Sequence, residues 1–171
     1  QPTVELDYSS LHIHLLYSQK KKNYEDVFGK GSDPYALAGL EIKYRNIIKV
    51  AFLVSLNMKT KKNYVQAVTR RLRDEDLYIR NIPYTKIINQ LMAKHTTIKE
   101  YFFSGIGLDL MYFDSLLTDY VAWKCTSRKI PVLSIHDSYI VEKKYEHLLR
   151  DLMQQAIKHN KFISMPMIKA K

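Results

Sequence analysis

The stretch PVLSIHDSYIV at residues 131–141 breaks the helical pattern of the second half of the chain. It is a short apolar run with the polar residues HDS at its centre, which is typical of two strands joined by a tight turn. We therefore predict a hairpin with strands at 132–135 and 139–141. The start of the chain, VELDYSSLHIHLLY at residues 4–17, opens with another apolar strand around Val4 and Leu6.

Most of the remaining segments have apolar residues at helical spacing. Ser9 and Ser10 are candidate N-caps for the first helix, and Asp33 followed by Pro34 is a pair expected at a helix start. The polar stretch 18–33 is expected to be a connection rather than an element. Predicted helices lie at 11–17, at 33–57 with a break near Gly39, and at 64–73, 84–94, 108–124 and 145–158.

These elements predict an α+β fold. A small antiparallel sheet, made of the first strand and the hairpin, would be backed by helices, and the helices between the two would form one compact insertion. We expect residues 1–32 and 98–171 to form the part that carries the sheet, and residues 33–97 to form the helical insertion.

Charge and cysteine content narrow the functional class. The chain has 27 Lys and Arg against 17 Asp and Glu, a formal charge of +10, which favours a polyanionic partner, with nucleic acid first and an anionic membrane surface second. Cys125 is the only cysteine, so the sequence contains no intrachain disulfide and no thiolate zinc cluster. With no signal-peptide pattern and no apolar run long enough to span a bilayer, we expect a soluble protein of the cytoplasm with no membrane partner.

Two aspartates stand at the ends of the predicted strands. Asp7 and Asp137 are 130 positions apart, and each follows an apolar strand. Taken singly, Asp7 is more typical of a helix cap and Asp137 of a hairpin turn. If the strands are neighbours, however, the two carboxylates meet at one edge of the sheet, where their repulsion favours a hard divalent cation between them.

Arg45 and Lys49 are four residues apart in a predicted helix, so they project from one face. Two cations at this spacing can bind the phosphates of a nucleotide. The alternative is a solvated basic face of a helix.

Three motifs together resemble the A-family DNA polymerases of the bacterial repair and phage replicative type. DYSS at residues 7–10 resembles the first motif of the family's palm domain, and HDS at residues 136–138 resembles its last. The serine of HDS is also found in phage-type single-subunit RNA polymerases. Arg45 and Lys49 stand between these motifs in the right order, as in the helix of the family's fingers domain.

The resemblance implies a role for each matched residue. Asp7 and Asp137 would bind two Mg²⁺ ions, for which Mn²⁺ is a possible substitute, and the backbone carbonyl of Tyr8 would contact one of them. Arg45 and Lys49 would bind the triphosphate. His136 would lie near the primer terminus.

Four positions differ from the family pattern, one of which is Asn57, in the place of a Tyr that packs near the templating base. His12 stands where the bacterial enzymes carry the glutamate that screens the sugar, and Leu53 occupies the place of an aromatic residue; both positions belong to the nucleotide-binding set. Ser138 replaces the usual final acid. The preference for deoxyribose or ribose is therefore open.

The implied function is that of the catalytic core of a DNA-directed DNA polymerase, with a palm at 1–32 and 98–171 and fingers at 33–97. DNA primer-template and nucleoside triphosphates would be its partners. The alternatives are a single-subunit RNA polymerase or primase-like enzyme, and a non-catalytic nucleic-acid-binding module that retains the palm fold. Because six residues precede Asp7, we expect the chain to be a fragment of a longer polymerase or to be completed by an accessory protein.

Overall fold

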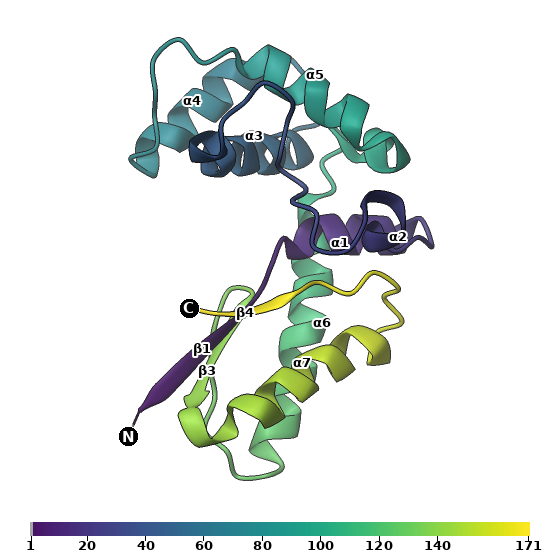
Figure 1. Cartoon of the computed structure of the whole chain (residues 1–171), viewed down its shortest axis with the longest axis vertical. Helices are drawn as coiled ribbons and strands as arrows, with labels where there is room; N and C mark the ends of the chain where they lie inside the picture. Colours follow the sequence, from purple (N-terminus) through teal and green to yellow (C-terminus); the bar gives the residue numbers. More distant parts are fainter. Residues whose placement is uncertain (1) are drawn as a thin grey trace. The chain divides into compact units, whose positions relative to one another are not determined.

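In a computed structural model that describes residues 2–171, the chain divides into two compact units. The first unit consists of Gln1–Ser32 and Leu110–Lys171, and the second is the intervening segment Asp33–Asp109. The second unit is therefore an insertion in the first. Figure 1 shows the elements of both.

The first unit contains an antiparallel sheet of four strands in the order β2-β3-β1-β4. The predicted first strand and hairpin are confirmed, whereas β4 was not predicted because its three residues form no alternating run. Strand bounds are β1 Thr3–Tyr8, β2 Leu133–Ile135, β3 Ser138–Glu142 and β4 Ile168–Ala170.

One face of this sheet forms the core of the first unit. Leu6 and Tyr8 of β1 and Tyr139 and Val141 of β3 are all buried, as the alternation of a strand requires. Helix α6 (Gly107–Thr126) and helix α7 (Glu146–His159) contribute to the same unit, and the Tyr8 hydroxyl donates to the carbonyl of Met153 in α7 at 2.6 Å. The predicted α+β class, with an antiparallel sheet backed by helices, is confirmed.

The segment after β1 differs from the prediction in two details. Helix α1 (Leu11–Gln19) forms as expected, but Ser10 has a left-handed backbone (φ 57°) and its side chain makes no capping bond. The polar connection contains a short helix, α2 (Tyr24–Phe28), whose N-cap Asn23 accepts from the Glu25 amide. The polar local sequence did not indicate this helix. Its Tyr24 ring is buried and packs against Tyr17 (5.4 Å between ring centres).

The second unit is a bundle of helices in which α3, α4 and α5 pack on one another. The helices predicted from residues 64 and 84 are confirmed. The helix predicted from residue 33 is wrong in its first half, because Asp33 Oδ1 accepts from the Tyr35 amide in a turn instead of capping a helix. Helix bounds are η1 Ile42–Tyr44, α3 Arg45–Asn57, α4 Tyr64–Asp74, α5 Tyr84–Lys94 and η2 Thr96–Tyr101.

The second unit extends twelve residues beyond the predicted insertion, to Asp109 instead of residue 97. Aromatic packing explains the extension. Phe102 lies against Phe52 of α3 (5.4 Å between ring centres), and Phe103 lies against Tyr64 of α4 (5.2 Å). The interpretation of the two units as palm and fingers stays a prediction. No helix within residues 2–171 is long and apolar enough to cross a membrane.

Candidate active site

The pairing of β1 with β3 decides where the two predicted metal ligands lie. Asp7 is the register partner of Ser138, and the next residue, Tyr8, donates its backbone N–H to the Asp137 carbonyl at 3.3 Å. Asp7 and Asp137 therefore lie at the same end of two adjacent strands, although 130 positions separate them in sequence.

The hairpin turn between β2 and β3 is closed by two residues, His136 and Asp137. Ile135 and Ser138 are register partners on either side of the turn, and His136 has a left-handed backbone (φ 53°). The buried Ser138 hydroxyl bonds to the Ile135 carbonyl (3.0 Å) and to Glu5 Oε1 (2.7 Å). Ser138 thus holds the Glu5 carboxylate beside the turn.

An ammonium group also lies among these acids. Lys171 Nζ is 3.0 Å from Glu5 Oε1 and 3.6 Å from Asp7 Oδ1. Burial lowers the pKa of Lys171, but the hydrogen bond to Glu5 and the charges of Asp7, Glu5 and Asp137 raise it above its usual value overall. This end of the sheet therefore attracts positive charge.

Asp114 in α6 is an acid near Asp137 that sequence reasoning missed. Its Oδ1 atom is buried and has no hydrogen-bond partner within residues 2–171. Burial and, to a lesser degree, the charge of Asp137 raise the pKa of Asp114 to about 6, while His136 opposes the shift. Nothing in the helical pattern around Asp114 indicated this proximity, which arises from packing of α6 against the hairpin.

The donors at this end of the sheet fit a hard divalent cation. Within residues 2–171 there is no group of three or more His, Cys, Asp or Glu side chains arranged to hold a metal ion. Mg²⁺ does not require one, because it usually keeps several waters and is bound by one or two carboxylates together with substrate phosphates. Asp7 and Asp137 supply two carboxylates, and the position of Lys171 shows that the place accepts a cation.

The first unit contains three other predicted site residues, Tyr8, His12 and His136. The Tyr8 ring is buried and packs edge-on against Tyr139, and burial raises the pKa of its hydroxyl. Its side chain is structural, and the role predicted for the Tyr8 backbone carbonyl stays a prediction. His12 lies in α1 and is partly buried, while His136 is exposed in the hairpin turn.

In the second unit, Arg45, Lys49 and Leu53 lie on one face of α3. The spacing of four places them one turn apart, and all three are partly exposed while most of the rest of the helix is buried. The Arg45 side chain is not solvated freely: its Nε donates to Asp33 Oδ2 at 2.8 Å. Lys49 makes no ion pair within residues 2–171.

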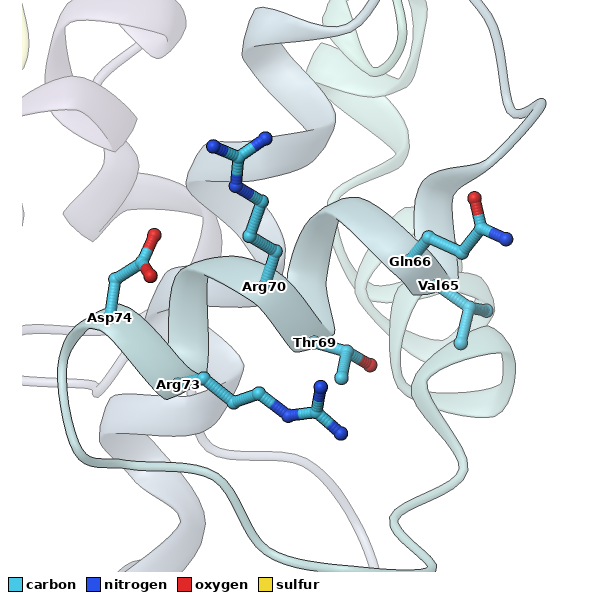
Figure 2. A pocket seen from close by; sticks show the side chains of 6 residues that line it. All are labelled: Val65, Gln66, Thr69, Arg70, Arg73 and Asp74. Atoms are coloured by element: carbon cyan, nitrogen blue, oxygen red, sulfur yellow. The ribbon is translucent and has the colours of Figure 1, made fainter.

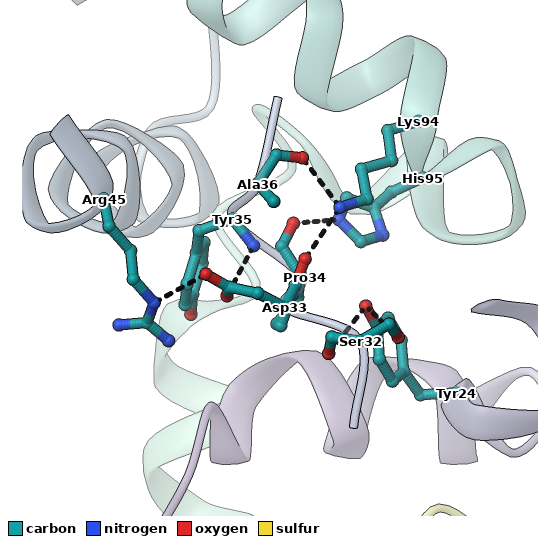
Figure 3. A network of polar contacts seen from close by, with 9 residues as sticks. All are labelled: Tyr24, Ser32, Asp33, Pro34, Tyr35, Ala36, Arg45, Lys94 and His95. Carbon is teal, nitrogen blue, oxygen red and sulfur yellow. Dashed lines mark hydrogen bonds and ion pairs between the residues drawn. The ribbon is translucent and has the colours of Figure 1, made fainter. Parts of the chain in front are cut away.

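The segment around Asp33 is anchored to α5, as Figure 3 shows. Lys94 Nζ donates to the carbonyls of Asp33 and Ala36, both at 2.8 Å. His95 Nε2 donates to the Pro34 carbonyl at 2.9 Å, and burial lowers the pKa of His95 to about 4. The backbone before α3 is therefore fixed by side chains from the end of α5.

A basic face covers α4. No Asp or Glu stands between Glu41 and Asp74 in the sequence. A pocket of about 320 Å³ lies along this face, and Figure 2 shows Arg70 and Arg73 extending from the helix beside it. The guanidinium of Arg73 lies 4.8 Å from the Tyr78 ring centre. The lining residues are Val65, Gln66, Thr69, Arg70, Arg73 and Asp74.

Comparisons with known proteins show similarity at the level of structure. No protein-family model and no curated protein matches the chain. The solved structure of the POL domain of Pol1 from M. smegmatis, in complex with DNA primer-template and dNTP, is similar with a TM-score of 0.47 and 9% sequence identity. The similarity covers 99% of this chain and 39% of that chain, so this chain spans about two fifths of the length of that protein.

Proposed function

We propose that the protein carries out template-directed nucleotidyl transfer as the catalytic core of a DNA-directed DNA polymerase of the A-family type. The observation that carries the proposal is the β1–β3 register, which puts Asp7 and Asp137 at the same end of adjacent strands. Two separate motifs that resemble one family's metal-binding motifs thereby become neighbours in the fold.

The proposed chemistry needs these two carboxylates to act together. The reaction forms a bond between the primer 3′ oxygen and the α-phosphorus, breaks the bond to the β-phosphate, and releases pyrophosphate and the hydroxyl proton. Two Mg²⁺ ions, with Mn²⁺ as a substitute, would supply the activation of the hydroxyl and the stabilisation of the leaving oxygen. Asp7, Asp137 and the Tyr8 carbonyl would hold them.

Other residues would bind the substrates. Arg45 and Lys49 offer two cations one helical turn apart for the triphosphate, and Leu53 continues the same face. His12 would contact the nucleotide, and the exposed His136 would lie at the primer terminus.

The basic face of α4 supports a nucleic-acid partner for the second unit. Arg70 and Arg73 are exposed, and the acid-free stretch before Asp74 supplies the excess positive charge that phosphate contacts require. DNA primer-template is the partner that the proposed reaction requires.

A second candidate is a non-catalytic nucleic-acid-binding module that keeps this fold. The contact of Lys171 with Glu5 and Asp7 favours it, because an ammonium at this place can substitute for a divalent cation. Within catalytic functions, an RNA polymerase or primase-like enzyme is favoured by His12 and Ser138. Extension of a primed template with deoxy and ribo triphosphates in parallel distinguishes these two sugar preferences.

Primer extension with Mg²⁺ tests the proposal. The protein should extend a primed DNA template, and Asp137→Ala should abolish extension. Asp151→Ala is the matched control, because it removes an exposed acid from α7 of the same unit. Equal extension by Asp137→Ala and the unsubstituted protein would refute catalysis by this site, and nucleic-acid binding without extension by either would favour the non-catalytic module.

A further inference from the structure

Asp33 binds Arg45 at one edge of its guanidinium group. The contact joins Arg45 Nε to Asp33 Oδ2 at 2.8 Å, with both side chains about two thirds buried. The other carboxylate oxygen, Oδ1, accepts from the Tyr35 amide at 3.1 Å. Each oxygen of Asp33 therefore has its own donor, and the carboxylate cannot rotate without breaking one of the two bonds.

The opposite edge of the Arg45 guanidinium, which carries the two Nη groups, can donate to a further hydrogen-bond partner. The two Nη groups of Arg45 make no hydrogen bond within residues 2–171, and Figure 3 shows them pointing away from the Asp33 carboxylate. The Tyr35 ring covers one face of the group, with its centre 5.1 Å from the guanidinium carbon. This ring is itself buried and packs on Phe52 (6.0 Å between ring centres).

The backbone that carries Asp33 is also held in place by side chains from the end of α5. Lys94 holds the carbonyls of Asp33 and Ala36, and His95 holds the carbonyl of Pro34. Asp33 thus reaches Arg45 from a backbone that α5 anchors, rather than from a free loop. An ion pair that served only to neutralise Arg45 would need none of this support.

We propose that Asp33 is a positioning residue, which holds the Arg45 guanidinium by its Nε edge so that the Nη edge is ready for the triphosphate. The inference rests on the proposed function, in which Arg45 binds phosphate. Two Nη donors in a fixed plane match two phosphate oxygens, and a side chain that is ordered beforehand does not lose its rotamer freedom when the nucleotide binds.

The direction in which nucleotide affinity changes when the Asp33 carboxylate is removed shows whether Asp33 positions Arg45 or competes with phosphate for it. Removing an acid near an anion site strengthens anion binding if only net charge matters, and it does so even more if the acid competes with phosphate for Arg45. Positioning predicts the reverse: the protein without the Asp33 carboxylate binds nucleotide more weakly although it is more positive.

The test compares Asp33→Asn, Arg45→Lys and the double variant. Asn retains a carbonyl oxygen for the Tyr35 amide but loses the carboxylate that holds Nε. Nucleotide affinity is measured by equilibrium titration of a labelled deoxynucleoside triphosphate into the protein bound to primer-template, and KM and kcat are measured by primer extension. Glu41→Gln is the matched control, because it removes the same charge from an exposed pair with Lys43 (2.9 Å) near the start of α3.

Asp33→Asn should raise both the Kd and the KM for nucleotide about tenfold, a loss typical of one long side chain that must be ordered on binding, with kcat nearly unchanged. Glu41→Gln should not weaken binding. In the Arg45→Lys background Asp33→Asn should have no further effect, because Asp33 acts through the guanidinium. If Asp33→Asn fails to fold, as judged by thermal unfolding, Asp33→Ser replaces it, since a hydroxyl can also accept from the Tyr35 amide.

Unchanged or tighter nucleotide binding by Asp33→Asn, or effects of the two substitutions that simply add, would overturn the inference. If Arg45→Lys weakens binding while Asp33→Asn does not, positioning fails and the proposed nucleotide site stands. If Arg45→Lys has no effect, or if the protein binds no nucleotide, the proposed role of Arg45 fails and the inference fails with it.

Discussion

The two units bring their charged residues together by different means. In the first unit, Asp7 and Asp137 are neighbours because β1 pairs with a strand from the far end of the chain. In the second unit, Arg45 and Lys49 are neighbours because they are one turn apart in α3. The first arrangement depends on the tertiary fold, whereas the second survives wherever the helix forms.

The two charged sites also differ in how their charges are balanced. In the first unit, Asp7, Asp137 and Glu5 lie near the ammonium of Lys171, so like charges gather there. In the second unit, Arg45 pairs with the opposite charge of Asp33. If the proposed roles hold, an added cation would stabilise the acidic cluster, and Arg45 would be ordered before an added anion binds.

The largest expected difference between the two units is in how a matched core substitution in each affects the Mg²⁺ requirement of primer extension. Leu6 in β1 and Leu91 in α5 are both fully buried, and replacing either by Ala should lower the free energy of unfolding by about 2–5 kcal/mol. At a temperature where both variants stay folded, Leu6→Ala should also raise the Mg²⁺ concentration needed for half-maximal primer extension. The same rise in Leu91→Ala would contradict the view that the sheet of the first unit positions the acid site.

Acidification should destabilise each unit through one buried histidine. Burial lowers the pKa of both His14 and His95 to about 4, so each stays neutral in the folded state while the unfolded chain takes up a proton near the usual value of 6.5. The stability that each contributes is present above pH 6.5 and is lost as the pH falls towards 4, by about 3 kcal/mol for each histidine.

Urea unfolding at pH 7 and pH 4.5 measures this loss. His95→Gln should lose less stability on acidification than the unsubstituted protein, because Gln can still donate to the Pro34 carbonyl but does not titrate. His147→Gln, at an exposed position of α7, is the control and should leave the acid dependence unchanged. An equal acid-induced loss in His95→Gln would exclude His95 as a source of it.

Substitutions on the basic face of α4 should weaken nucleic-acid binding without affecting the acid site. If Arg70 and Arg73 each contact one phosphate, Arg70→Gln with Arg73→Gln should reduce the salt slope of single-strand binding by about 1.4. Arg71→Gln is the control, since Arg71 does not line the pocket and pairs with Glu75 at 2.6 Å. Equal changes in slope for the double variant and Arg71→Gln would rule out a localised contact.

The smallest expected effect concerns Lys171. Its ammonium is half exposed, so its pairing with the acids contributes at most about 1 kcal/mol. Lys171→Met should therefore lower the Mg²⁺ concentration for half-maximal extension by up to about fivefold. An increased Mg²⁺ requirement would show that Lys171 assists the site instead of competing with the metal.

Local patterns were enough to predict α4 and α5 of the second unit but not the conformation around Asp33. The helix at Tyr84–Lys94 is confirmed to the residue, because its apolar spacing and the preceding proline are local signals. Asp33 and Pro34 carry an equally local signal for a helix start, yet Asp33 is used in a turn and in the pair with Arg45. A tertiary ion pair thus overrode the capping preference.

The acid site, too, could be predicted from local sequence only in part. The adjacency of β1 and the hairpin was predictable from two apolar strands with Asp at their ends. Asp114 and Lys171 were not, because the first approaches Asp137 through helix packing and the second follows a strand of three residues with no alternating pattern. The local sequence around such residues does not indicate which residues of other elements they will approach.

The most direct test of the central claim is the single-nucleotide extension rate of Asp7→Asn, Asp137→Asn and the double variant in Mg²⁺. Because the two carboxylates are proposed to act as one unit, each single substitution should reduce the rate by about a thousandfold or more, and the double variant should be little worse than either. A single variant that extends primer at the rate of the unsubstituted protein would contradict the claim.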